Sequence, residues 1–194
     1  MRYTITSQHL DYIRKEGHIE FVDFYNEKEA SALRSLLDEV LSKNPSGRDL
    51  ERYNSSLFKA AFFSRLAQVA SALFNQKRLK LAFTQYYPHY KCMAALEDIS
   101  SVTEICGVAL VNLSETPLPE FPYLPLKMGD LGFYQIDFPI DFTDLEKPVF
   151  LIAFSTEVAR YKFQEKDPET HILKKLGYAA GDRLRDETHP LLIK

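Results

Sequence analysis

The spacing of the apolar residues changes once along this chain, and that change limits the folds it can adopt. Before about residue 77, apolar residues recur at steps of three and four, as one face of a helix requires. The clearest such stripe consists of Ala30, Leu33, Leu36, Leu37, Val40 and Leu41. From Leu79 onward, short apolar runs separated by turn residues predict β-strands. Helices followed by strands are typical of an α+β domain.

Three helices are expected in the first part of the chain. Asn26 followed by Glu29 is the pattern of a capping box, in which each side chain bonds the backbone N–H of the other residue, so a helix should begin there. We expect helices over 7–16, 26–41 and 56–74, with a strand over 18–24. Later strands are expected over 79–87, 105–113, 131–138 and 148–155, weaker ones over 93–99 and 158–163, and a short helix over 170–176.

The length of 194 residues fits one domain. We expect a single domain over 1–194, with a mainly helical part (1–76) packed on a β core (77–165) and a C-terminal extension (166–194). At 45% hydrophobic residues, with 14 Phe and 11 Tyr, the chain has enough apolar material for a packed core.

Charge and cysteine content argue against several classes of partner. The net charge of −3 gives no general attraction to nucleic acid or anionic lipid, so neither is an expected partner. The basic cluster of Lys77, Arg78 and Lys80 beside a strand is interpreted as a solvated edge. Cys92 and Cys106 form neither a disulfide framework nor a CxxC metal motif. Without a signal peptide or an apolar run of about 20 residues, the expected location is cytoplasmic.

Several short motifs resemble one known family. They are the stretch YIRKEGHIEF at 12–21, GVALVNL at 107–113, MGDLGF at 128–133, and KLGY and GDRL at 175–178 and 181–184. Together they resemble the Fe(II)/2-oxoglutarate-dependent dioxygenases of the phytanoyl-CoA-hydroxylase-like type, including an uncharacterised chlamydial member that lacks the iron triad. The resemblance implies a double-stranded β-helix (jelly roll, cupin-like) flanked by N-terminal helices.

The resemblance also implies where an iron site would lie, and this chain departs from the pattern there. The family holds iron with two imidazoles and one carboxylate. By position, Asp98 keeps the carboxylate but Leu96 stands where the first histidine is expected, and 134–139 contains no distal histidine. Lys147 stands in place of the arginine that clamps the co-substrate. The resemblance therefore implies the fold without catalytic residues, metal ligands or a cofactor.

Polar side chains around the expected cavity form a candidate pocket. His89 lies in an aromatic and polar stretch at a strand end, where it borders a pocket or serves a structural role. Asp98, Gln135 and Asp137 offer oxygen atoms for a cation as an alternative. The candidate pocket consists of Tyr87, His89, Lys91, Asp98, Gln135, Asp137 and Lys147.

The other histidines give weaker signals. His9 and Asp11 form a literal His-x-Asp pair, but residues two apart on a helix diverge by about 200° and do not readily share a metal. His171 and His189 are expected to be solvated.

Three functions follow as hypotheses. The favoured one is a non-catalytic protein that keeps the cavity and binds a small molecule or a protein. The alternative is a divergent oxygenase or metal-dependent enzyme that uses a non-standard site in the same cavity. The least favoured is a metal-responsive transcriptional regulator, because no basic recognition helix or His/Cys cluster is evident.

Overall fold

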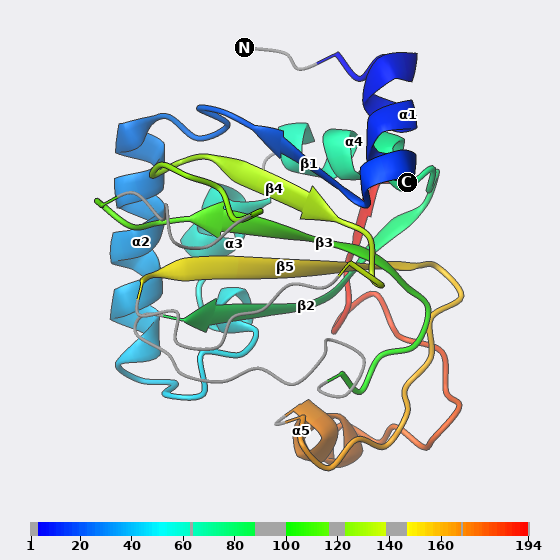
Figure 1. Cartoon of the computed structure of the whole chain (residues 1–194). Helices are drawn as coiled ribbons and strands as arrows, with labels where there is room; N and C mark the ends of the chain where they lie inside the picture. The colour runs from blue at the N-terminus through cyan, green and yellow to red at the C-terminus, as the bar shows by residue number, and fades with distance from the viewer. Residues whose placement is uncertain are drawn as a thin grey trace.

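The computed structural model describes residues 4–62, 64–87, 100–116, 123–138, 147–167 and 169–193. Its centre is an antiparallel sheet with the strand order β1-β4-β3-β5-β2-β6 (Figure 1). The strands are β1 (His18–Phe21), β2 (Leu79–Tyr87), β3 (Ile105–Asn112), β4 (Leu131–Tyr134), β5 (Val149–Thr156) and β6 (Leu191–Ile193). The N-terminal helices lie on one side of this sheet, and residues between Ala159 and Leu184 cover the other, as expected of an α+β fold.

The helical side is built by α1 (Ser7–Glu16), α2 (Glu27–Leu41), α3 (Ser55–Ala61) and α4 (Ser64–Leu73), with the 3-10 turn η1 (Leu50–Tyr53). The predicted capping box is confirmed: Glu29 N donates to Asn26 Oδ1 at 3.0 Å and Asn26 N donates to Glu29 Oε2 at 2.9 Å. The apolar stripe of α2 joins one core cluster with every second residue of β3 and β5. Burial of this stripe therefore fixes the helix against the sheet.

The single long helix expected over 56–74 is wrong, since α3 and α4 are separate. Phe62 leaves the helical conformation with φ −110° and ψ 43°. The Tyr25 hydroxyl donates to Ala61 O at 3.0 Å, so a side chain satisfies a carbonyl at the end of α3. A tyrosine distant in the sequence thus contributes a contact at the interruption that periodicity does not reveal.

The long strands are buried on both faces, which explains their nearly continuous apolar sequences. Val108 and Leu110 of β3 point away from the helices, toward a second cluster that includes Leu151 and Phe83. The C-terminal part of the chain covers this face with Ala159, Tyr161, Leu173, Tyr178 and Leu184. In Figure 1, α5 (Glu169–Lys175, orange) and the segments around it lie at the β2 side of the sheet.

Three strand predictions need correction. The strand expected over 18–24 ends at Phe21, because a turn follows in which Asp23 has a positive φ of 53°. The strand expected over 131–138 ends at Tyr134, which pairs with His18 at the start of β1, and one further backbone bond follows, from Gln135 N to Gly17 O at 2.8 Å. The stretch 158–163 forms isolated bridges, Val102 with Tyr161 and Arg160 with Arg183, rather than a strand. The predicted strand over 93–99 lies outside the described residues.

The C-terminal extension contributes two elements to the body. The short helix predicted near 170–176 is confirmed as α5, and β6 pairs with the start of β2 through Leu79 and Lys80. Of the helices described, none has the length and apolar character needed to cross a membrane.

Candidate functional site

The candidate pocket residues that the structure describes fall into two groups at opposite ends of the sheet. Tyr87 is the last residue of β2 and pairs with Val149, close to Lys147 in the chain. The Lys147 ammonium donates to Thr116 Oγ1 at 2.8 Å. These half-buried residues lie at the end where β5 begins.

Gln135 and Asp137 follow β4 at the other end, because β4 and β3 are antiparallel and Tyr134 pairs with Val108. Gln135 lines a pocket of about 240 Å³ on the helical side, together with Arg14 and Cys106. Asp137 is exposed. His89, Lys91, Asp98 and Leu96 lie outside the described residues, so the candidate pocket as a whole remains a prediction.

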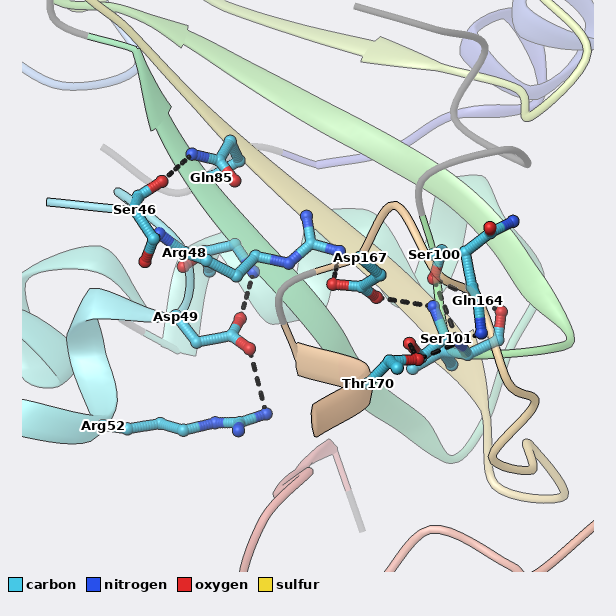
Figure 2. A network of polar contacts seen from close by, with 12 residues as sticks. Ser46, Arg48, Asp49, Arg52, Gln85, Ser100, Ser101, Gln164, Asp167 and Thr170 are labelled. Carbon is cyan, nitrogen blue, oxygen red and sulfur yellow. Dashed lines mark hydrogen bonds and ion pairs between the residues drawn. The ribbon is translucent and has the colours of Figure 1, made fainter. Parts of the chain in front are cut away.

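A buried polar network lies where the loop before η1 crosses the edge of β2 (Figure 2). Gly47 and Asp49 extend the sheet: Tyr86 N donates to Gly47 O at 2.9 Å, and Asp49 N donates to Thr84 O at 3.1 Å. Asp49 Oδ1 also accepts the Thr84 N–H at 2.7 Å. Asp49 has a positive φ of 49°. One backbone and one side-chain hydrogen bond to Thr84 hold Asp49 in this left-handed conformation.

Arg48 passes from this loop to the face of the sheet that the C-terminal part covers. Its guanidinium carbon lies 3.7 Å from the centroid of the Phe83 ring, and Nη2 lies 3.1 Å from Asp167 Oδ1. Only 2% of the Arg48 side chain and 1% of the Asp167 side chain is exposed. Charges this deeply buried require pairing, which each supplies to the other.

Asp167 connects the pair to two further segments. Its Oδ2 accepts the Ser101 N–H at 2.6 Å, while the Ser101 and Thr170 hydroxyls are 2.6 Å apart. Figure 2 shows these residues converging from the loop before η1, the segment before β3 and the start of α5. In this arrangement the charges of Arg48 and Asp167 neutralise each other, and the hydrogen bonds of Asp167 and Ser101 join the three segments.

Glu51 ends the network on the helical side. Thr84 Oγ1 donates to Glu51 Oε2 at 2.5 Å, and Glu51 Oε1 makes no hydrogen bond with the described residues. Burial, with a smaller effect from the nearby Asp49 carboxylate, raises the pKa of Glu51 to about 8. Thr84, the Glu51 backbone and Arg52 oppose this shift. The carboxyl group therefore favours its neutral form near neutral pH.

Two residues expected to be solvated are buried instead. Lys80 is 3% exposed, and its Nζ donates to Leu184 O at 2.8 Å and to Asp186 Oδ1 at 2.6 Å. His189 is 1% exposed. Burial, followed by the charges of Arg52, Lys80 and Arg48, lowers the pKa of His189 to about 3. Both predictions failed because the C-terminal segment folds back over β2. The only signal for Lys80 was its place in an otherwise apolar strand.

The four described histidines have different surroundings. The His9 ring accepts the Thr6 N–H at 3.0 Å, and the His18 ring packs among Tyr12, Tyr123 and Phe138. His171 is exposed on α5. Within the part of the chain that the structure describes, no three His, Cys, Asp or Glu side chains are grouped to hold a metal ion.

No family model matches this sequence, and no curated protein is significantly similar to it. Solved structures are similar over nearly the whole chain. The α-ketoglutarate-dependent carbocyclase SnoK from nogalamycin biosynthesis superposes with a TM-score of 0.77 at 14% identity, covering 98% of this chain and 97% of its own. The chain has the Fe(II)/2-oxoglutarate oxygenase-like fold.

Two further structures agree. The α-ketoglutarate-dependent epimerase SnoN, also from nogalamycin biosynthesis, gives a TM-score of 0.69 at 15% identity over 96% of this chain and 98% of its own. CT296 from Chlamydia trachomatis gives 0.59 at 20% identity over 80% of this chain and 99% of its own. The oxygenase-like fold confirms the predicted jelly roll with flanking helices. Identities this low establish the fold alone.

The described residues do not fit the iron centre that the oxygenase-like fold implies. A centre with two imidazoles needs at least one histidine besides His89, because the chain has five histidines and four are described. Those four take part in a helix cap, an aromatic cluster, an exposed helix face and the buried C-terminal segment.

Proposed function

We propose that this protein is a non-catalytic descendant of the Fe(II)/2-oxoglutarate oxygenase fold that binds a small molecule or a protein. The observation that carries the proposal is the distribution of the histidines. His9 and His189 contact neighbours within their own segments, with ring nitrogens directed to Thr6 and Thr188. Each of these contacts occupies Nδ1 of the ring, and recruiting His189 to a shared metal through its other nitrogen would require exposing a buried side chain.

The side chain of Lys147 supports a binding role over an oxygenase role. Lys147, at the position that the family resemblance assigns to the co-substrate arginine, bonds Thr116. An ammonium is a point charge and lacks the planar fork that clamps a carboxylate in two places. The proposed cavity would thus hold 2-oxoglutarate weakly even if a metal were supplied.

Anaerobic titration of the purified chain with Fe(II) and 2-oxoglutarate tests the proposal, with SnoK as the positive control. We expect no stoichiometric iron, no near-visible charge-transfer band and no 2-oxoglutarate turnover after oxygen is admitted. One equivalent of iron together with turnover would overturn the proposal.

The variants His89→Ala and Asp98→Ala distinguish the alternative, a divergent enzyme with a non-standard site. Under that alternative, at least one of them abolishes metal binding. Under our proposal, both behave as the parent protein does with iron.

A further inference from the structure

A second pocket lies between η1 and α3 on one side and the C-terminal part of the chain on the other. It has a volume of about 260 Å³. Its walls come from η1 (Glu51, Arg52 and Tyr53), α3 (Phe58), β2 (Leu81) and the C-terminal part (Ile172, Leu176, Glu187, Thr188 and Pro190). None of these residues belongs to the candidate pocket discussed above.

The pocket has a fixed floor and an apolar rim. Leu81 N donates to Pro190 O at 3.1 Å, which ties the C-terminal segment to β2 beneath it. Tyr53, Ile172 and Leu176 are large apolar side chains that are 57%, 36% and 46% exposed. Ile172 and Leu176 are four residues apart and share one helix face, since Leu176 N bonds Ile172 O at 3.0 Å. Exposed apolar groups that surround a hollow are typical of a ligand site.

The polar wall supplies an unused acceptor. Glu51 is 4% exposed and one of its carboxyl oxygens makes no hydrogen bond with the described residues, although such buried atoms are normally paired. Glu187 adds a second acidic side chain to the lining. The single lining cation, among the residues described, is Arg52, whose Nη2 lies 3.1 Å from Asp49 Oδ2 and is thereby neutralised. A positively charged partner would therefore meet two acidic side chains in this wall, one of which, Glu51, it would have to draw into its ionised form.

We propose that this pocket binds a small organic amine with an apolar, preferably aromatic, body. The ammonium would bond Glu51 and stabilise its ionised form, which burial near Asp49 otherwise disfavours. Phe58 and Tyr53 would contact the body, and aromatic faces also attract a cation. The volume is below the roughly 300–1,000 Å³ of pockets for drug-sized ligands, so a fragment-sized molecule fits best. None of the lining residues belongs to the positions that the family resemblance assigns to iron.

Three probes of similar shape and different charge test the proposal: 2-phenylethylamine, neutral 2-phenylethanol and anionic 3-phenylpropionate. Binding is followed through the methyl NMR signals of Leu81, Ile172 and Leu176 in the full chain. We expect the amine to shift these signals saturably and to bind about tenfold or more tightly than the anion, as expected for a charge-assisted hydrogen bond.

Two variants and a control locate the amine. Glu51→Gln keeps the shape of the side chain, and Leu176→Lys changes a rim residue that is 46% exposed. Each should weaken amine binding about tenfold, while Glu39→Gln on the exposed face of α2 should not. The proposal is overturned if no probe binds, if the anion binds as well as the amine, or if neither variant weakens the amine.

Discussion

The guanidinium of Arg48 and the carboxylate of Asp167 are 3.1 Å apart and almost completely buried, which joins the loop before η1 to the start of α5. Each charge depends on the other, and Asp167 also anchors the backbone of Ser101. Removing one partner leaves a buried charge without compensation, whereas exposed pairs contribute little.

Arg48→Ala should therefore lower the free energy of unfolding by about 3–5 kcal/mol. Arg78→Ala is the matched control, because its partner Glu157 and Arg78 itself are 43% and 55% exposed, and it should cost less than about 1 kcal/mol. Urea denaturation measures both. Equal losses in the free energy of unfolding would mean that the buried pair stabilises the fold no more than the exposed pair does.

Glu51 should make the protein less stable as the pH rises. Its pKa is raised from 4.5 to about 8 in the folded state, so the folded chain binds the proton more tightly than the unfolded chain does. Stability from this group is therefore complete below pH 4.5 and is lost as the pH rises through 8. Glu51→Gln should remove this part of the pH profile, measured by urea denaturation between pH 5 and 9. An unchanged slope would contradict the assignment.

His189 should make the protein less stable at acid pH. Its pKa is lowered from 6.5 to about 3, so below pH 6.5 the unfolded chain takes up a proton that the folded chain does not. Stability consequently falls as the pH decreases from 6.5 toward 3. We expect His189→Gln to flatten acid unfolding curves in this range. The exposed His171→Gln should retain the parent profile.

Substitutions at Gly129 and Gly181 distinguish the cost of steric crowding from the cost of backbone strain. Both have positive φ, +90° and +93°, but a Cβ at Gly129 would lie 2.1 Å from Tyr25 O, whereas none of the described atoms lies within 4 Å of one at Gly181. Gly181→Ala should cost about 1–2 kcal/mol from strain alone. Gly129→Ala should cost at least about 3 kcal/mol, because Tyr25 N also bonds Gly129 O. Thermal or urea unfolding of both variants compares them directly.

Local patterns predicted the parts of the fold that local interactions determine. The capping box at Asn26 and the stripe of α2 depend on residues within one helix, and both were confirmed. Periodicity missed the end of α3, where Tyr25, which is remote in sequence, bonds Ala61 O. The long strands were found because burial on both faces leaves continuous apolar runs.

The polar contacts could not be predicted in the same way. The residue types alone do not indicate that Arg48 pairs with Asp167. They also do not indicate that the C-terminal segment buries Lys80 and His189. Antiparallel pairing also places Gln135 and Asp137 far along the sheet from Tyr87 and Lys147, a relation that depends on strand order. For His89, Lys91 and Asp98, the sequence-based assignment stays a prediction.

The strand order has a consequence for how the chain reaches its native state. Among the described strands, only β3 and β4 are both consecutive in the chain and adjacent in the sheet. Every other neighbouring pair requires a long loop to close before its hydrogen bonds can form, and such topologies fold slowly, in about milliseconds to seconds. During that interval the apolar β5, which must find β2 and β3 on either side, has both edges open to other chains. Refolding yield should consequently depend on protein concentration more steeply than native stability does.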